Sequence, residues 1–130
     1  MKVLIVEDVD FIANIAKKIL TSAEVESDIA LTPSDAKKRV ETTEYDAILM
    51  DFGLPEMTGL ELTKVLREKG YSRPIVGLTA NPDEYQVEDM KASGLNACLG
   101  KPLTTDDIKL LSIDPSLGWV DNGRGDNKGN

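Results

Sequence analysis

Four short apolar stretches recur along the chain, and a polar residue ends each of them. The polar residues are Glu7 with Asp8, then Asp51, Thr79 and Lys101. A short, continuous apolar run is typical of a strand that is buried on both faces, as in a parallel sheet. The pattern therefore predicts four such strands, at residues 3–6, 47–50, 75–78 and 97–100.

Helical periodicity separates these strands, and the alternation predicts an α/β layered fold with right-handed crossovers. The helix that follows Asp8 carries an apolar stripe, which is the pattern of a helix packed on a core. The members of that stripe are Phe11, Ile12, Ile15, Ala16, Ile19 and Leu20. A weaker run from Glu26 to Leu31 alternates in polarity, which suggests an edge strand.

Capping signals mark the next two helices. Thr32, with Pro33 at the first helical position and Asp35 at the third, predicts the start of a second helix. A third helix is predicted from about Leu60 to Glu68, and Gly70 ends it. The side chains of this third helix that we expect to face inward are Leu62, Val65 and Leu66.

Two further helices are predicted in the second half of the chain. Asn81, Pro82 and Glu84 repeat the capping pattern and predict a fourth helix. Its apolar face is thin and consists mainly of Tyr85, Val87 and Met90. Such a helix suits either a switch element that shifts easily or simply a solvated helix. A fifth helix opens at Thr104 and is short, because Asp114-Pro115 should end it.

The polar residues at the strand ends predict a shared pocket. Ligands bind beyond the carboxyl ends of the strands in parallel sheets, so neighbouring strands bring their terminal residues together. Three carboxylates in one pocket are difficult to keep ionised. Mg²⁺ relieves this repulsion because it prefers oxygen ligands. We therefore predict Glu7, Asp8 and Asp51 as ligands of Mg²⁺.

Asp51 is also a candidate nucleophile, because a carboxylate accepts a phosphoryl group as an acyl phosphate. Phosphoryl transfer depends mainly on positioning and on neutralising the charge of the equatorial oxygens. Lys101 supplies a positive charge for that purpose, and the Thr79 hydroxyl can donate a hydrogen bond to a phosphoryl oxygen. Backbone N–H groups near Phe52, Gly53 and Ala80 are further candidate donors.

Together these motifs resemble the receiver domain of two-component response regulators. The matching residues are the acidic pair Glu7-Asp8, Asp51 within the segment 49–59, Thr79-Ala80 and Lys101-Pro102, and they occur in the family's order. The resemblance covers roughly residues 1–112. It implies a flavodoxin-like (βα)5 three-layer sandwich, with a five-stranded parallel sheet of order 2-1-3-4-5.

The resemblance also implies a function and a set of site residues. It implies Mg²⁺-dependent phosphorylation of Asp51 by a phosphohistidine donor, either a histidine kinase or a histidine phosphotransfer domain. Gly53 would offer its backbone carbonyl to the metal, and the Lys101-Pro102 bond resembles a family position that is usually cis. The segments 77–81 and 54–60 resemble receivers attached to hybrid histidine kinases, although such receivers often carry Asn where this chain has Ile12.

Cys98 departs from the family pattern. The family usually has Tyr, Phe or His three residues before the lysine, and that ring turns inward when the switch threonine moves. A cysteine is small and is expected here to pack in the core. A ring-rotation switch is therefore in doubt, and a signal would have to travel through Thr79, the following loop and the fourth helix alone.

Composition narrows the remaining possibilities. The 130 residues predict one receiver domain at 1–112 and a tail at 113–130, with the glycine- and asparagine-rich segment from Asp121 expected to be disordered. A net charge of -8 argues against direct nucleic-acid binding, and no apolar stretch is long enough for a bilayer. A single cysteine, and a start that runs straight into the first strand, predict a cytoplasmic protein without a signal peptide.

The same residues also bear on other possible functions. The chain has no histidine, so the phosphohistidine donor must come from elsewhere. A Mg²⁺-dependent phosphatase of the haloacid-dehalogenase type usually carries a second acid two residues after its nucleophile, where this chain has Gly53. A free-standing single-domain regulator and a binding module that works without phosphorylation stay open as alternatives, and the oligomeric state is not predicted. A receiver would catalyse only its own phosphorylation and dephosphorylation.

Overall fold

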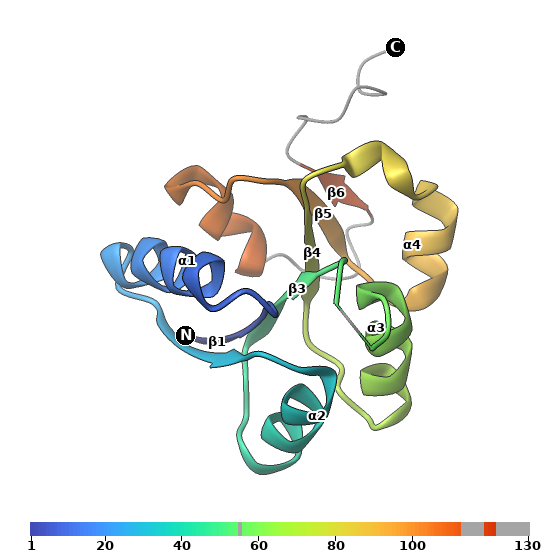
Figure 1. The fold of residues 1–130 in the computed structure, drawn as a ribbon, viewed down its shortest axis with the longest axis horizontal. Helices are drawn as coiled ribbons and strands as arrows, with labels where there is room; N and C mark the ends of the chain where they lie inside the picture. Colours follow the sequence, from blue (N-terminus) through green and yellow to red (C-terminus); the bar gives the residue numbers. More distant parts are fainter. Residues whose placement is uncertain (55, 113–118, 122–130) are drawn as a thin grey trace.

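A parallel sheet of six strands forms the centre of the computed structural model, which describes residues 1–54, 56–112 and 119–121. The strands are β1 (Lys2–Val6), β2 (Glu26–Ala30), β3 (Ala47–Asp51), β4 (Ile75–Thr79), β5 (Ala97–Gly100) and β6 (Val120–Asp121). Their order is β2-β1-β3-β4-β5-β6 (Figure 1). The predicted order of the first five strands is confirmed, and β2 lies at the edge as predicted.

The sixth strand is an addition that the sequence did not predict. Val120 pairs with Ala97 and Asp121 pairs with Cys98, so β6 extends the sheet beyond β5. The prediction that the disordered segment begins at Asp121 was wrong for this residue, because its backbone pairs with the sheet. Residues 113–118 and 122–130 of the predicted tail lie outside the described residues, so the domain boundary at 112 stays a prediction.

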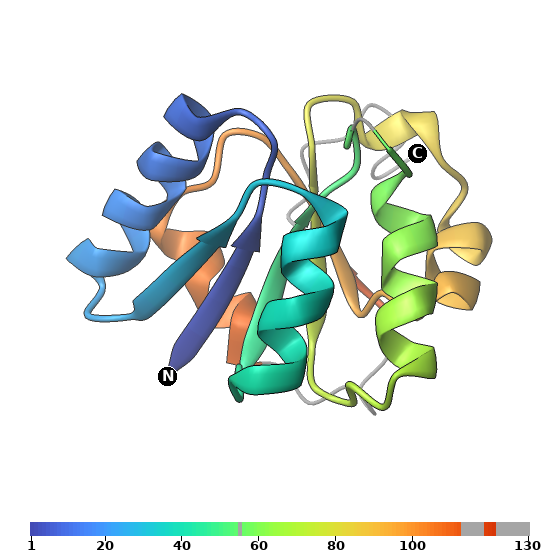
Figure 2. The same ribbon diagram turned by 60° about the horizontal axis from the view of Figure 1, so that its bottom comes forward.

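Strands β1, β3, β4 and β5 send alternate side chains to two separate cores, as the period of a β-strand requires. One core receives Val3 and Ile5 and is covered by α1 (Asp10–Ser22) and η2 (Thr105–Ser112). The other receives Leu4 and Val6 and is covered by α2 (Pro33–Thr42), α3 (Gly59–Glu68) and α4 (Val87–Ser93). Figure 2 shows these helices on the two sides of the sheet. Burial on both faces explains why the strands read as continuous apolar runs.

Helix α1 buries a narrower stripe than the sequence predicted. Ala13, Ala16 and Leu20 are its buried residues. Phe11 is 74% exposed, and Ile12 and Ile15 are exposed as well. The prediction of one continuous core-facing stripe was therefore wrong for these three residues. Two alanines let α1 lie close to the sheet, and the larger side chains at its N-terminal end face outward.

Helices α2 and α3 begin at capped threonines. The Thr32 hydroxyl accepts a hydrogen bond from the Asp35 backbone N–H at 3.0 Å, as predicted. The α3 helix begins with a capping box that was not predicted. In it Thr58 accepts from the Glu61 N–H at 3.1 Å, and the Glu61 carboxylate accepts from the Thr58 N–H at 2.9 Å. Leu62 and Leu66 are buried, which confirms the predicted inward face for these two residues, whereas Val65 is only half-buried.

The segment after β4 differs from the predicted single helix. Residues Pro82–Glu84 form a short 3-10 helix, η1, and the Asn81 side chain makes no capping hydrogen bond. Tyr85 is extended, with φ -122° and ψ 147°, and interrupts the helical path before α4 starts at Val87. The predicted fifth helix is the 3-10 helix η2, and Thr104 directly precedes its first residue, Thr105. The Asp107 carboxylate accepts from the Thr104 N–H and hydroxyl, both at 3.0 Å, which agrees with the predicted opening at Thr104.

Candidate functional site

The ends of β1, β3, β4 and β5 meet at one edge of the sheet, as predicted. The strand register aligns Asp51 with Leu78 and Thr79 with Gly100. The Lys101 N–H then donates to the Thr79 carbonyl at 2.7 Å, which fixes the start of the loop after β5. A pocket of about 570 Å³ opens here, and Glu7, Asp8, Asp51, Thr79 and Lys101 all line it. The five predicted side chains are thus brought together.

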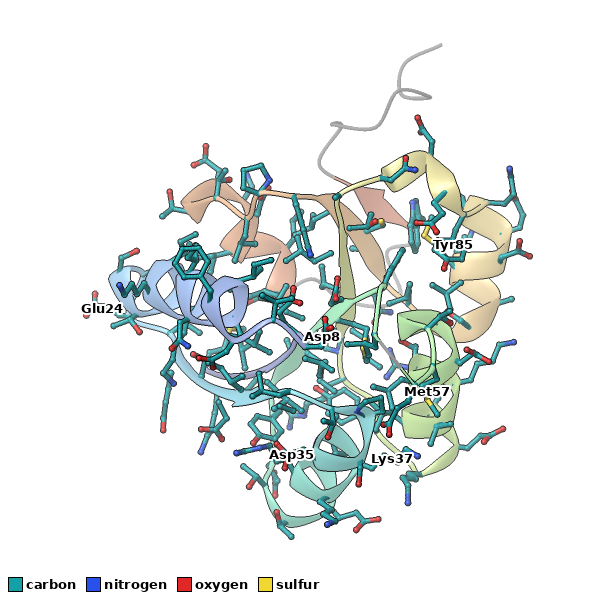
Figure 3. The ribbon with its side chains drawn as sticks, in the orientation of Figure 1. Asp8, Glu24, Asp35, Lys37, Met57 and Tyr85 are labelled. Atoms are coloured by element: carbon teal, nitrogen blue, oxygen red, sulfur yellow. The ribbon has the colours of Figure 1, made fainter. Side chains whose placement is uncertain are left out.

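Three carboxylates form a cluster in this pocket. Oxygen atoms of Glu7, Asp8 and Asp51 all lie within 4.8 Å of one another. Glu7 and Asp51 are buried, whereas Asp8 lies closer to solvent, near the centre of the view in Figure 3. Two buried acids beside a third are the donor set that a hard divalent cation prefers. The residues therefore fit Mg²⁺ by the chemistry of their ligand atoms.

Lys101 is the cation that lies between the two buried carboxylates. Its Nζ donates to Asp51 Oδ1 at 3.1 Å and to Glu7 Oε1 at 3.2 Å. The other Glu7 oxygen, Oε2, accepts from the Val9 backbone N–H at 3.2 Å. The positive charge of this ammonium group thereby offsets part of the negative charge of the carboxylates at this edge of the sheet.

The pKa shifts of Glu7 and Lys101 reflect the same crowding of charged groups. Burial raises the pKa of Glu7, and the neighbouring charge of Asp51 raises it further, against the lowering effects of Val9 N–H and Lys101. Burial on its own lowers the pKa of Lys101, but the charges of Asp51 and Glu7 outweigh it, so the pKa is raised overall. The charged form of Glu7 is therefore less favoured here than in water, and an additional positive charge would offset this effect.

Thr79 links the pocket to the segment that leads to α4. It is buried at the end of β4, and its Oγ1 accepts a hydrogen bond from the Asn81 backbone N–H at 3.1 Å. Rotation of the Thr79 side chain would disturb this bond, so the hydroxyl connects the pocket to the backbone of residues 80–85.

Some predicted features of the site are present and others stay predictions. The Lys101-Pro102 peptide bond is cis, which confirms the expectation from the resemblance. Gly53 lines the pocket, and its carbonyl as a metal ligand stays a prediction. The aromatic residues in the pocket wall were missed. Phe52 and Tyr85 contact each other edge to face, with ring centroids 5.3 Å apart and planes at 83°. No sequence motif marks this pair, because its members are distant in the chain.

An exposed apolar surface adjoins the pocket. We call Val9, Phe11, Ile12 and Ile15 the α1 patch; all four are exposed. A wholly apolar groove of about 220 Å³ continues from it between α1 and the loop after β5. Its lining includes Ile12, Ile15, Ile19, Leu78, Pro102 and Leu103. Because Ile12 and Lys101 line both the groove and the acidic pocket, the two are contiguous.

Fold and pocket together define an α/β domain with an acidic pocket at the carboxyl edge of its sheet. The family model described as the response regulator receiver domain matches residues 3–111. The chain therefore belongs to the response regulator receiver domain family. This membership makes the chain a signalling domain of two-component systems.

Several known proteins are similar to this chain. The sensor protein EvgS of Escherichia coli is 37% identical over 109 residues, which are 84% of this chain and 9% of EvgS. Two-component response regulator 24 of Arabidopsis thaliana is 35% identical over 114 residues, which are 85% of this chain and 78% of that protein. The chain thus spans a small part of the sensor protein EvgS and most of the plant regulator.

A solved structure shares the fold and contains a bound metal. The response regulator TrrA from Thermotoga maritima, in complex with Mg²⁺ and BeF, superposes with a TM-score of 0.74 and 26% identity. The match covers 84% of this chain and 93% of that one. None of the helices in the described part of this chain has the length and apolar character that a bilayer crossing needs.

Proposed function

We propose that Asp51 accepts a phosphoryl group from the phosphohistidine of a histidine kinase or histidine phosphotransfer domain. The observation that carries this proposal is the position of Lys101 Nζ, 3.1 Å from one Asp51 oxygen, inside a pocket that also holds Thr79 and two more acids. A carboxylate beside a fixed cation and a hydroxyl suits in-line attack on phosphorus.

In the proposed reaction an Asp51 oxygen forms a bond to phosphorus as the phosphorus–nitrogen bond of the donor breaks. The departing imidazole nitrogen keeps the electron pair of that bond. Lys101 balances negative charge on the transferred group, and the Thr79 hydroxyl donates to one of its oxygens. Glu7, Asp8, Asp51 and the Gly53 carbonyl would hold Mg²⁺, which supplies further positive charge to the phosphoryl oxygens when bound.

A protein donor is favoured by the α1 patch. Exposed apolar side chains that gather beside a reactive site are typical of a protein contact surface. The groove that joins the patch to the pocket lets a partner helix rest on α1 while its phosphohistidine reaches Asp51. We propose this surface as the docking site of the phosphodonor domain, in a cytoplasmic relay without direct contact of this domain with nucleic acid or membrane.

We favour a receiver of a hybrid histidine kinase, because most of this chain resembles a part of the sensor protein EvgS and a part of the hybrid signal transduction histidine kinase G of Dictyostelium discoideum. A free-standing regulator is the alternative supported by the similarity to the Arabidopsis protein. In either case the domain would catalyse only its own phosphorylation and dephosphorylation. A binding module that works without phosphorylation would not need the ammonium group of Lys101 between the carboxylates of Asp51 and Glu7.

Intact-protein mass spectrometry after incubation with acetyl phosphate and Mg²⁺ tests the acceptor. The wild type should gain one phosphoryl group, and Asp51→Asn should gain none. Asp89→Asn, at an exposed site on α4, is the matched control and should gain one as well. A metal-free sample should stay unmodified. Phosphoryl uptake by Asp51→Asn would refute the assignment of the acceptor.

A further inference from the structure

Strand β2 forms one outer edge of the sheet, on the side where α1 packs (Figure 2). At the opposite edge β6 pairs with β5, whereas no strand in the described part of the chain pairs with the outer side of β2. An edge strand presents backbone N–H and C=O groups that can pair with an extended segment of another chain. The outer side of β2 is therefore the place where another strand could extend this sheet.

The pairing of β2 with β1 determines which residues face this open edge. The Glu26 N–H donates to the Met1 carbonyl at 3.2 Å, and the Ala30 carbonyl accepts a hydrogen bond from the backbone at the end of β1 at 3.1 Å. The N–H and C=O of one strand residue point to the same side, and that side alternates from one residue to the next. Ser27 and Ile29 therefore present their backbone groups to the open edge.

Lys17 of α1 reaches one of these backbone groups. Its Nζ donates to the Ser27 carbonyl. Lys17 follows the buried Ala16 and is half-buried, whereas the next residue, Lys18, is exposed. An ammonium group bound to an edge carbonyl occupies an acceptor that an added strand would use. It also places a charge in the path of that strand, which is a common protection of edge strands.

An open β2 edge would be a hazard in this chain because an apolar surface lies on the neighbouring helix. The α1 patch is exposed, and α1 is the helix that packs beside β2. Exposed apolar side chains favour association between molecules. An edge strand close to them would add backbone hydrogen bonds to such an association. A group that blocks the edge therefore keeps the patch available for other partners.

We propose that Lys17 closes the outer edge of β2 against strand addition, and that without it a second copy of this chain pairs through the same edge. Two identical edges meet antiparallel about a twofold axis. A register centred on Ile29 sets the two Ile29 side chains opposite each other, which is a favourable β-branched pair. The same register sets Asp28 opposite Ala30 of the second copy and keeps the two Asp28 carboxylates from facing each other. Phosphorylation takes no part in this closure, so its test is independent of Asp51.

Sedimentation velocity of the full chain over a wide range of concentrations tests the closure. Lys17→Met should self-associate at concentrations at least about tenfold lower than the wild type, because the Ser27 carbonyl becomes available. Loss of a lysine makes this acidic chain more negative, which by itself opposes association. Lys18→Met makes the same charge change at the neighbouring exposed position and should match the wild type, and Lys17→Arg retains a charged donor and should stay monomeric. If Lys17→Met associates no more than Lys18→Met, the closure is refuted.

Ser27→Pro in the Lys17→Met background shows whether the association uses this edge. The Ser27 N–H faces the open edge, so proline removes no bond to β1 but blocks an added strand. The Ser27 hydroxyl has no hydrogen-bond partner among the residues that the structure describes. The double variant should return to the monomer, and association that persists in a folded double variant would overturn pairing through β2.

Hydrogen exchange of Lys17→Met at low and high concentration decides the same question if the proline variant does not fold. Exchange at residues 27–31 should slow several-fold at the high concentration, because pairing of the two β2 edges protects their backbone N–H groups. Slowing at other segments with none at 27–31 would contradict the proposed pairing.

Discussion

Gly77 lies in β4 beneath the ring of Phe52, and replacing it with alanine tests how tightly this part of the core is packed. A Cβ at Gly77 would lie 2.3 Å from Phe52 Cε1 and 2.6 Å from its Cζ. Carbon atoms are in comfortable contact from about 3.5 Å, so the ring edge would have to retreat by about 1.2 Å. The ring is buried and contacts Tyr85, so its retreat would strain Phe52 or displace Tyr85.

Overpacking of this kind typically lowers the free energy of unfolding by about 1–3 kcal/mol. We expect Gly77→Ala to fall in that range when unfolding is measured in urea by circular dichroism. Gly53→Ala is the matched control, because a Cβ at Gly53 has nothing within 4 Å. That variant should stay within about 0.5 kcal/mol of the wild type.

A double-mutant cycle separates the ring clash from any other effect of the added methyl group. In a Phe52→Leu background the Cε1 and Cζ atoms are gone, so Gly77→Ala should be less destabilising by about 1 kcal/mol or more. If Gly77→Ala destabilises both backgrounds equally, the clash with Phe52 is not the cause. If it leaves the wild type as stable as before, the close packing of Phe52 on β4 is refuted.

Three further predictions concern other parts of the chain. Phe11→Ser should leave the free energy of unfolding within about 0.5 kcal/mol, since the side chain is exposed. The Phe11→Ser variant should accept a phosphoryl group more slowly than the wild type from a purified phosphotransfer domain, but at the same rate from acetyl phosphate. If the variant and the wild type react equally fast with the protein donor, the α1 patch is not the docking site. Thr58→Ala removes the capping hydroxyl of α3 and should lower stability by about 1 kcal/mol in urea unfolding, and an unchanged midpoint would contradict the cap. A hydrogen bond from the Tyr45 hydroxyl, together with the charges of Lys2 and Arg39, lowers the pKa of Asp28 in the folded protein. Ionised Asp28 therefore stabilises the fold at pH values above the pKa that Asp28 has in the unfolded chain. Asp28→Asn should be less stable than the wild type at pH 7, and the difference should persist to about pH 4 and disappear as the pH falls further; a difference that does not depend on pH would refute the pairing.

The strands and the pocket could be predicted because one physical constraint produces both signals. A strand covered by helices on both faces has to be apolar throughout, and its first polar residue then marks the carboxyl edge of the sheet. Asp51 and Thr79 follow this pattern, and the structure brings both into one pocket. The sequence also contains the capping signals of α2 and α3. Thr32 accepts the predicted hydrogen bond, and the Thr58 to Glu61 pattern of the capping box is present in the sequence although it was not predicted.

The exposed side of α1 could not be predicted because apolar periodicity does not identify what covers a helix. Alanines at 13 and 16 and Leu20 meet the sheet, and the larger Phe11 and Ile15 are left outside. A core-facing stripe and a partner-facing stripe have the same composition, so the sequence pattern supports both. The start of α4 was mispredicted for a different reason. The residues at Asn81 and Pro82 start only the short 3-10 helix η1, without a side-chain capping bond, and the extended Tyr85 separates η1 from α4.

Cys98 shows how packing from distant segments changes an expectation drawn from one position. The sequence placed a small side chain where the family usually has a ring, and it left Thr79 and the fourth helix as the only route for a signal. In the structure five aromatic side chains from elsewhere in the chain belong to the same core cluster as Cys98 or pack against it: Tyr45, Phe52, Tyr71, Tyr85 and Trp119. A core has to be filled to its usual density by whichever residues the fold brings near. The rings that fill this core therefore come from segments other than β5, which contributes Cys98.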